Sequence, residues 1–408
     1  MKAIIKERPE QGKEWETGLR FVEKPIPTLQ KDTDVKLQII ASAICGTDLG
    51  IYNSKESLRD PMSVAMKPDV IIGHEFCSTL SEAGAAARVH LAALLITEAR
   101  GDRVIQRFIK GRSAKGLAKD THFLEFLSEH FYSTAEMHVT CGKCYQCRTG
   151  QRHICSNTII RGIQDDGAFT RYIVLPAENI RIFKKGDIPP DVIAFMDAIG
   201  NATHTVQSAN VRGKTIAITG LGVQGLMATA IAKSAGAKKI FVTDASHGEF
   251  TYEKLANGRF RLARLYGADD CFDVHIDNDK DRFYKTVKKA TNGVGVDAVL
   301  EMSGNYKAYD DAFRVLRMGG CMSLLGLPGG MMVVDFSKDV IFKGVTIHGV
   351  IGRRVWETWD MMTHILRKGL AKTFIETGFI THDLLLEKYE EGFQAIMNGD
   401  ALKVILRP

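Results

Sequence analysis

Four cysteines near the middle of the chain have a spacing that suits a metal ion. Cys141, Cys144, Cys147 and Cys155 follow the pattern C-x2-C-x2-C-x7-C. Thiolates this close can converge on one ion, and a set of four is typical of a closed, structural zinc site. A disulfide pair and an iron–sulfur cluster are the alternatives for these residues. The spacing predicts a structural zinc lobe over residues 138–156.

A second set of metal-binding residue types comes from two separated segments. Cys45 is followed by Gly46 and Thr47, and the pair His74 and Glu75 lies further along the chain. A soft thiolate, an imidazole and a carboxylate are typical of an open, catalytic zinc site. A histidine that stands alone is more often structural, so this prediction depends on the order of the motifs.

A glycine-rich turn predicts a dinucleotide site. Gly220, Gly222 and Gly225 follow a strand-like run and open a helix-like one. The first glycine permits a tight turn, the second lets the backbone approach a pyrophosphate, and the third lets helix and strand pack closely. Asp244 lies 19 residues after Gly225, where a carboxylate accepts ribose hydroxyls and repels a 2′-phosphate. We therefore expect NAD rather than NADP, with a helix cap as the alternative role of Asp244.

Together these motifs resemble the zinc-dependent medium-chain alcohol dehydrogenase family, over nearly the whole chain. The resemblance implies a catalytic zinc bound by Cys45, His74 and Glu75, a structural zinc, and hydride transfer from a small alcohol to NAD. It also implies that Thr47 belongs to a proton relay and that Asp197 acts near the metal, as a fourth ligand or a polar relay group. The cofactor residues that it adds are Gln224, Arg259, Leu325, Gly326, Leu327, Val350 and Ile351.

Several segments, above all residues 352–359, are similar to the threonine-oxidising members of this family. The similarity implies oxidation of L-threonine at its 3-hydroxyl to 2-amino-3-oxobutanoate, a step of threonine catabolism. Threonine carries an ammonium and a carboxylate, so we expect Arg353, Arg354 or Glu357 to help position it. A related secondary-alcohol, diol or polyol dehydrogenase is the alternative enzyme. A zinc- and NAD-binding protein without turnover is the alternative from another class.

One position departs from the family pattern. The resemblance implies a relay histidine five residues after the zinc-binding cysteine, and this chain has Gly50 there. Glycine cannot transfer a proton, so another group, such as His138, His204 or water, must complete the relay, or turnover is slow. We expect the small residue to leave space that water fills.

The order of strand and helix signals predicts an α/β protein of two domains. Residues 1–203 are β-rich with many Gly and Pro turn signals, which favours a compact barrel-like fold. From residue 214 onward, short apolar runs alternate with helical stretches, one of them over 308–318, which predicts a doubly wound parallel sheet. With the resemblance, the division becomes a GroES-like catalytic domain over 1–203 and 349–408 and a Rossmann NAD-binding domain over 204–348.

The chain has more residues before the cysteine cluster than the resemblance leads us to expect. Residues 84–132 show helical periodicity, with Phe123, Leu127 and Phe131 at i, i+4 and i+8. We expect an inserted helical hairpin in the catalytic domain, as a surface decoration or subunit contact rather than an active-site lid. A smaller excess follows Asp244.

Length and composition limit the classes of protein. The 408 residues are 45% hydrophobic and 25% charged with a net charge of +6, as in ordinary globular proteins. No run approaches the ~18 apolar residues of a membrane span, and the N-terminus lacks the apolar core of a signal peptide, so we expect a cytoplasmic protein. A basic stretch over 103–119 is more simply a solvated helix face than a nucleic-acid site. The resemblance implies a homo-oligomer that acts on a small molecule, without nucleic-acid or membrane partners.

Overall fold

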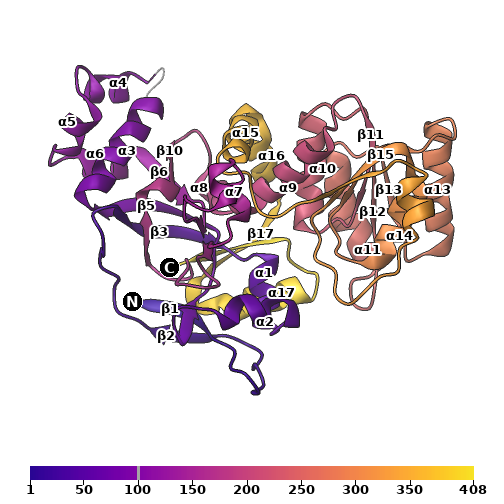
Figure 1. Cartoon of the computed structure of the whole chain (residues 1–408), viewed down its shortest axis with the longest axis horizontal. Coiled ribbons are helices and arrows are strands. Elements are labelled where there is room, and N and C mark those ends of the chain that lie inside the picture. Colours follow the sequence, from indigo (N-terminus) through magenta and orange to yellow (C-terminus); the bar gives the residue numbers. More distant parts are fainter. Residues whose placement is uncertain (99–101) are drawn as a thin grey trace. The chain divides into compact units, whose positions relative to one another are not determined.

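The computed structural model describes residues 1–98 and 102–408, which form two compact units (Figure 1). Each unit is assembled from separated parts of the chain. The first comprises Met1–Asp197, Ile380–Gln394 and Lys403–Pro408, and the second comprises Ala198–Phe379 and Ala395–Leu402.

Residues 349–379 group with the second unit, whereas the sequence interpretation joined them to the first. Aromatic packing gives the physical reason. The ring of Phe374 meets that of Tyr266 edge-on, with centroids 5.8 Å apart, and Phe379 also lies against Tyr266. These buried contacts anchor the segment to the strand-and-helix part of the chain.

A seven-stranded sheet forms the centre of the first unit. Its strands are β3 (Asp34–Ala43), β5 (Phe76–Ala83), β6 (Phe131–Ala135), β9 (Tyr172–Pro176), β10 (Ile180–Lys184), β17 (Ile380–Leu385) and β18 (Lys403–Arg407). They follow the order β10-β6-β5-β3-β18-β17, with β9 paired to β3. Two smaller sheets comprise β1 (Lys2–Glu7), β2 (Arg20–Glu23) and β4 (Asp69–Ile71), and β7 (His138–Val139) with β8 (Ile159–Ile160). The predicted β-rich, GroES-like fold is confirmed for this part of the chain.

Short helices connect the strands of the first unit. They are α1 (Gly46–Tyr52), α2 (Glu56–Ser63), α7 (Tyr145–Arg148) and α8 (Pro190–Ala194), followed by α9 (Met196–Ala209) and α17 (Tyr389–Met397), which run into the second unit. The shorter turns are η1 (Arg152–Ile154), η2 (Ala177–Asn179) and η6 (Leu386–Lys388).

The predicted insertion over 84–132 forms four helices rather than a hairpin, and its residues 99–101 lie outside the described part. The helices are α3 (Ala85–Glu98), α4 (Arg103–Ile109), α5 (Ala114–Ala118) and α6 (Phe123–His130). Leu91 and Phe123 are fully buried in the same apolar cluster as Val35 of β3. The segment therefore contributes to the core of the first unit, beyond the surface decoration that the sequence interpretation favoured.

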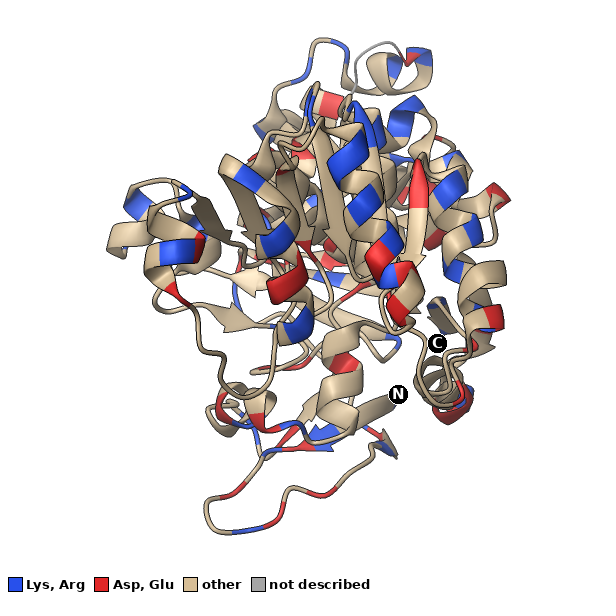
Figure 2. Cartoon of the chain, turned by 90° about the vertical axis from the view of Figure 1, so that its right-hand side faces the viewer, with Lys and Arg blue, Asp and Glu red and all other residues tan. Residues whose placement is uncertain are grey.

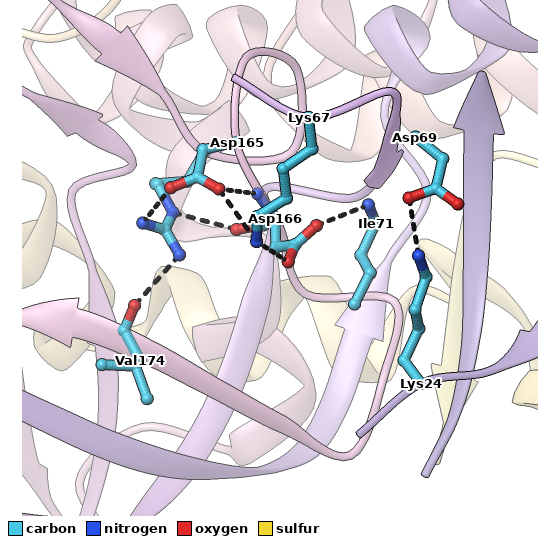
Figure 3. A network of polar contacts seen from close by, with 8 residues as sticks. Lys24, Lys67, Asp69, Ile71, Asp165, Asp166 and Val174 are labelled. Carbon is cyan, nitrogen blue, oxygen red and sulfur yellow. Dashed lines mark hydrogen bonds and ion pairs between the residues drawn. The ribbon is translucent and has the colours of Figure 1, made fainter. Parts of the chain in front are cut away.

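A network of ion pairs holds β4 in place within the first unit (Figure 3). Nζ of Lys24 lies 2.6 Å from Oδ1 of Asp69, and Asp166 accepts the backbone N–H of Ile71 at 3.0 Å. Lys67 pairs with the same Asp166. Because these contacts involve the first and last residues of β4, they also hold the start of the loop that follows it.

Six parallel strands form the sheet of the second unit. They are β11 (Thr215–Thr219), β12 (Lys239–Asp244), β13 (Asp270–Asp273), β14 (Val296–Glu301), β15 (Leu316–Leu324) and β16 (Thr346–Gly349). Their order is β13-β12-β11-β14-β15-β16, so the direction of winding reverses between β11 and β14. In open parallel sheets, ligands bind outside the carboxyl ends of the strands at such a reversal. The predicted doubly wound sheet is confirmed.

Helices of the second unit follow the strands in the predicted alternation. They are α10 (Val223–Ser234), α11 (Tyr252–Leu255), α12 (Arg261–Leu265), α13 (Asp277–Ala290), α14 (Tyr306–Val315), α15 (Glu357–Ile365) and α16 (Ala371–Glu376), with the π-helical turns η3 (Ala256–Phe260), η4 (Phe336–Ile341) and η5 (Leu366–Leu370). The helix predicted over 308–318 ends earlier, because Leu316 already pairs with Val296 of β14.

Charged residues of both signs are interspersed on the helices that Figure 2 presents. In α13, acidic residues lie in the first turn and basic residues in the last, which complements the helix macrodipole. Within the described ranges, no helix combines the length and the apolar character that crossing a membrane requires.

Candidate functional site

Three predicted zinc-binding side chains come together in the first unit. The ligand atoms of Cys45, His74 and Glu75 all lie within 4.8 Å of one another. Cys45 immediately precedes α1, and the other two residues follow β4. The start of a helix and the end of a strand therefore supply the set.

A tightly packed glycine fixes the direction of His74. Gly73 has a φ of +89°, and a Cβ atom there would overlap the ring of Phe169. The carbonyl of Gly73 also accepts the backbone N–H of Ala168 at 2.8 Å. A larger residue at position 73 would displace the loop that carries His74.

Asp48, buried within α1, connects two of the three ligands. Its Oδ2 accepts the backbone N–H of Cys45 at 2.9 Å, and its Oδ1 lies 3.4 Å from Nδ1 of His74. A carboxylate in this position orients the imidazole ring. Burial opposes a charged imidazole, but Asp48 and Cys45 outweigh it and raise the pKa of His74 above its usual range.

Lys403 of β18 places a positive charge beside Glu75. Its Nζ lies 2.5 Å from Oε2 of Glu75 and donates to the carbonyl of Ile44 at 3.1 Å. Burial raises the pKa of Glu75, Lys403 offsets part of the rise, and the charge of Asp197 adds to it. Asp197 therefore lies near this carboxylate, although its oxygens fall outside the three-atom cluster found among the described residues.

This donor set fits a divalent cation. Cys45, Asp48, Glu75 and Asp197 are all acidic groups, and Lys403 is the cation paired with one of them. In the described part of the chain, Oε1 of Glu75 is buried without a hydrogen-bond partner. Buried polar atoms normally have partners, and a zinc ion is one that thiolate, imidazole and carboxylate can share.

The position of the absent relay histidine is packed. Thr47 is half-buried in the first turn of α1, and Gly50 is buried further along the same helix. A Cβ atom at Gly50 would lie 2.5 Å from Cδ1 of Leu58 in α2. The expectation that water fills this place is wrong, because an apolar side chain occupies it.

The two histidines considered as substitutes have contacts of their own. Nδ1 of His138 lies 2.9 Å from Oε1 of Glu136 in the first unit. Nδ1 of His204 lies 2.9 Å from the carbonyl oxygen of Gly352 in the second unit. Each ring thus has a structural partner within its own unit.

The four-cysteine lobe has the geometry of a metal site. The sulfur atoms of Cys141, Cys144, Cys147 and Cys155 all lie within 4.8 Å of one another. Cys155 Sγ is 3.6 Å from Cys141 Sγ and 3.7 Å from Cys144 Sγ, well beyond the ~2.05 Å of a disulfide bond. The backbone amide of Cys147 lowers the pKa of Cys144 to about 6, whereas burial and the neighbouring thiols raise the pKa of Cys147, so the mutual distances of the sulfur atoms are what indicate a metal site.

The glycine-rich turn connects β11 to α10 at the reversal of the sheet. Gly220 has a φ of +86°, and a Cβ atom there would lie 2.6 Å from Cβ of Ser303. A Cβ atom at Gly225 would overlap the carbonyl oxygen of Gly220. Gly222 caps α10 and has open space around it, so the helix start presents bare backbone. Such a start suits the pyrophosphate of a dinucleotide.

Asp244 ends β12, and Arg259 reaches it from fifteen residues further along the chain. Nη1 of Arg259 lies 2.9 Å from Oδ2 of Asp244, and Oδ1 accepts the backbone N–H of Ala245 at 3.0 Å. The structure therefore brings two predicted cofactor residues into direct contact.

The other predicted cofactor residues gather at the ends of neighbouring elements. Leu325 and Gly326 follow β15 and donate backbone N–H groups to the carbonyl of Glu301 at 3.0 and 3.2 Å. Val350 follows β16 and donates to the carbonyl of Leu324 at 2.9 Å. The remaining members are Leu327 and Ile351, both exposed, and Gln224 in α10.

Sequence reasoning missed three residues of these sites: Lys403, Glu301 and Phe250. Lys403 lies 328 positions from its partner, so no local pattern could identify it. Glu301 accepts the backbone N–H groups of Ser303 at 2.8 Å and Gly304 at 3.1 Å. Glu301 lies at the end of a predicted strand, just before a turn of small residues. This position could have identified it from the sequence. Phe250 stacks on Arg259.

Two protein-family models match the chain. The alcohol dehydrogenase GroES-like domain matches residues 31–129 and 132–187, and the zinc-binding dehydrogenase model matches residues 222–368. The first match lies within the unit that carries the candidate zinc ligands, and the second lies within the unit that carries the glycine-rich turn.

L-threonine 3-dehydrogenases from several organisms are similar over the full chain. The one from Shewanella frigidimarina is 35% identical over 407 residues, covering 100% of this chain and 99% of that protein. The one from Caldanaerobacter subterraneus is 33% identical over 409 residues, with the same coverage. The one from Pyrococcus furiosus is 34% identical over 406 residues, covering 99% and 98%.

Solved structures share the fold at lower identity. An alcohol dehydrogenase from Thermotoga maritima superimposes with a TM-score of 0.76 at 22% identity, covering 100% of this chain and 99% of that one. A 2R,3R-butanediol dehydrogenase from Bacillus subtilis gives 0.75 at 19%, with the same coverage. The family predicted from the motifs is confirmed: the chain belongs to the zinc-dependent medium-chain alcohol dehydrogenases.

Proposed function

We propose that this protein oxidises L-threonine at its 3-hydroxyl to 2-amino-3-oxobutanoate, with NAD as the hydride acceptor, in threonine catabolism. The observation that carries the proposal is full-length similarity, at 33–35% identity, to L-threonine 3-dehydrogenases. As a zinc-dependent dehydrogenase, the protein uses zinc and a nicotinamide dinucleotide. The choice of threonine and of NAD belongs to the proposal.

We assign the catalytic zinc to Cys45, His74 and Glu75. When bound, the metal supplies a Lewis acid for the hydroxyl group of the substrate. Asp48 holds the backbone of Cys45 at 2.9 Å, and Lys403 holds Glu75 at 2.5 Å. These contacts keep the ligands in place before the metal arrives.

We assign the first step of proton removal to Thr47, because a hydroxyl group both donates and accepts hydrogen bonds. Leu58 fills the place beside Gly50, so the onward path of the proton does not run through that position. Asp197, close enough to Glu75 to raise its pKa, is assigned either as a further ligand or as a polar group beside the metal.

We assign a second, structural zinc to Cys141, Cys144, Cys147 and Cys155. The mutual distances of their sulfur atoms support this. A site of reduced thiolates also supports a cytoplasmic location, where disulfides rarely persist.

NAD is assigned to the second unit, with its pyrophosphate at Gly220, Gly222 and Gly225. The nicotinamide ring, when bound, accepts the hydride. Asp244 supports NAD over NADP, because a carboxylate accepts ribose hydroxyls and repels a 2′-phosphate. We likewise assign catalysis to the first unit and cofactor binding to the second, close to the division predicted from sequence.

The charged groups of threonine need partners with opposite charge. Arg353 is buried and donates to Oδ1 of Asn201 at 3.2 Å, so it serves the interior of the second unit. Arg354 and Glu357 are partly exposed and lie 3.7 Å apart. At least one of Arg354 and Glu357 is proposed to help position threonine.

An exposed apolar surface supports a homo-oligomer. Met331 and Val333 are 98% and 97% exposed, and Phe342 is 77% exposed. Apolar surface of this kind is typical of protein–protein contacts. We assign a second copy of the chain to this surface. Light scattering of the purified protein should give a mass above the 45.1 kDa of one chain. Replacing Met331 and Val333 by aspartate should lower that mass.

The deciding experiment is a substrate panel. The zinc-loaded protein, with NAD, should oxidise threonine much faster than 2,3-butanediol, sorbitol or ethanol. Equal activity on threonine and on uncharged 2,3-butanediol would reject the assignment. It would favour a secondary-alcohol or diol dehydrogenase, because the same fold occurs in 2R,3R-butanediol dehydrogenase.

A further inference from the structure

Residues 246–258 of the second unit connect β12 to η3, in the region where the sequence predicts a smaller excess of residues. Residues 246–258 leave the end of β12, form a tight turn, and pass through α11 into η3 (Figure 1). The turn is closed by two backbone hydrogen bonds of 2.9 Å, one in each direction, between His247 and Phe250. This turn places the ring of Phe250 inward, where it is buried.

The guanidinium group of Arg259 lies over the ring of Phe250. The guanidinium carbon of Arg259 lies 4.2 Å from the centre of the Phe250 ring, which is a close cation–π contact. At the same time, Nη1 of Arg259 lies 2.9 Å from Oδ2 of Asp244. The arginine is therefore held by two contacts, one with an aromatic ring and one with a carboxylate.

The segment is anchored on its other side by the turn after α17. Gly399, with a φ of +72°, approaches Phe250 so closely that a Cβ atom there would lie 2.7 Å from Cδ2 of the ring. Nζ of Lys254 lies 2.7 Å from Oδ1 of Asp400. Backbone packing and an ion pair thus prevent the ring from moving away from Arg259.

The restraint affects the two groups that distinguish NAD from NADP. An aspartate at the end of the second strand selects a free ribose 2′-hydroxyl, whereas a nearby arginine accommodates a 2′-phosphate. This chain has both, and a mobile arginine would weaken the discrimination by the aspartate. Holding Arg259 against Asp244 removes that freedom.

We propose that Phe250 is a positioning residue for cofactor selectivity: it holds Arg259 on Asp244, so that the site takes NAD and refuses NADP. The inference rests on the proposed NAD site of the second unit. It gives the 246–258 segment a role in the cofactor site that is separate from those of the glycine-rich turn and of Asp244.

The test is a titration of the zinc-loaded protein with NADH and with NADPH, in the absence of threonine. Binding is measured by the fluorescence of the nucleotide. Phe250→Leu keeps the apolar packing on Gly399 but removes the aromatic face. The ratio of the NADPH Kd to the NADH Kd should fall at least tenfold in this variant. Phe250→Tyr, which keeps the ring, should restore the ratio of the unmodified protein.

Two further variants separate this role from general loosening of the segment. Tyr252→Ala changes an exposed ring of the same segment and should leave the ratio unchanged. Adding Arg259→Gln to Phe250→Leu should remove the gain in NADPH affinity, because the freed guanidinium is its source. Thermal unfolding of each variant confirms that the comparison is made on folded protein.

The outcomes distinguish this inference from the proposed function. An unchanged ratio in folded Phe250→Leu, or a gain in NADPH binding that persists without Arg259, would overturn the role of Phe250 alone. Failure of the unmodified protein to bind either dinucleotide would overturn the cofactor site as well. Selective NADH binding without threonine oxidation would overturn the threonine assignment and leave the role of Phe250 intact.

Discussion

Lys403 and Glu75 form a buried ion pair in which Nζ and Oε2 are 2.5 Å apart. Neither side chain is more than 1% exposed, and the two residues lie on elements far apart in the sequence. Asp48 and Asp197 are also buried here, so Lys403 balances part of a concentrated negative charge. The pair joins the last strand of the first unit to the candidate zinc ligands.

Replacing Lys403 by methionine should therefore destabilise the protein strongly. Removing one partner of a buried pair leaves an uncompensated charge and costs about 3–5 kcal/mol. Urea unfolding monitored by fluorescence gives the free energy of unfolding. Lys2→Met is the matched control: its pair with Glu387 is more than half exposed on both sides, and it should cost less than ~1 kcal/mol. Equal losses in the two variants would show that burial of the Lys403 pair is unimportant.

Elemental analysis should find two zinc ions per chain. Cys45→Ser should lose one zinc and the activity while the fold remains. Cys144→Ser should lose the other and lower the unfolding temperature, because a structural metal contributes to folding. Cys321→Ser, outside both clusters of the described residues, should keep both ions. A single zinc in unmodified protein purified without chelator would contradict the assignment.

Introducing the relay histidine should require space at Leu58. Gly50→His alone should lose about 1–3 kcal/mol of stability, because the new side chain overlaps Leu58. The double variant Gly50→His/Leu58→Ala should lose less stability than the sum of the losses in the two single variants, by at least ~0.5 kcal/mol. Denaturation of the four proteins in this cycle measures the coupling. Gly50→His with Leu49→Ala, a neighbour on the same helix, should show no coupling; if it shows as much, the overlap with Leu58 is not the cause.

The pair of Asp297 with Arg317 should make stability fall in acid. Burial tends to raise the pKa of Asp297, but Arg317 at 2.8 Å and the backbone N–H of Thr215 outweigh it, so the pKa lies below its usual range. A carboxyl group whose folded pKa is lowered contributes stability above its unfolded pKa of about 3.9, and this is lost as pH falls through the folded value.

Asp297→Asn should consequently lower the midpoint of urea unfolding at pH 7. As the pH falls below 5, the midpoint should decline less in this variant than in the unmodified protein. Asp310→Asn, an exposed acid on α14, is the control and should follow the unmodified protein. If the midpoint of Asp297→Asn declines in acid as steeply as that of the unmodified protein, this carboxylate does not cause the loss of stability at low pH.

Local pattern was enough to predict the strongest features of this protein. The cysteine spacing, the glycine-rich turn after a strand and the strand–helix alternation each lie within a short stretch of sequence, where covalent reach and backbone geometry limit the possible structures. The candidate zinc ligands followed from residue types together with the family resemblance, and the structure brings Cys45, His74 and Glu75 together.

Tertiary structure alone decided what surrounds those residues. Lys403 beside Glu75, Leu58 beside Gly50, and Phe250 between Arg259 and Gly399 are contacts between elements separated along the chain. Such contacts depend on how strands pair and helices pack, which no local period encodes. The sequence by itself determined which groups could do chemistry, whereas packing determined their charge balance, the space around them and their freedom to move.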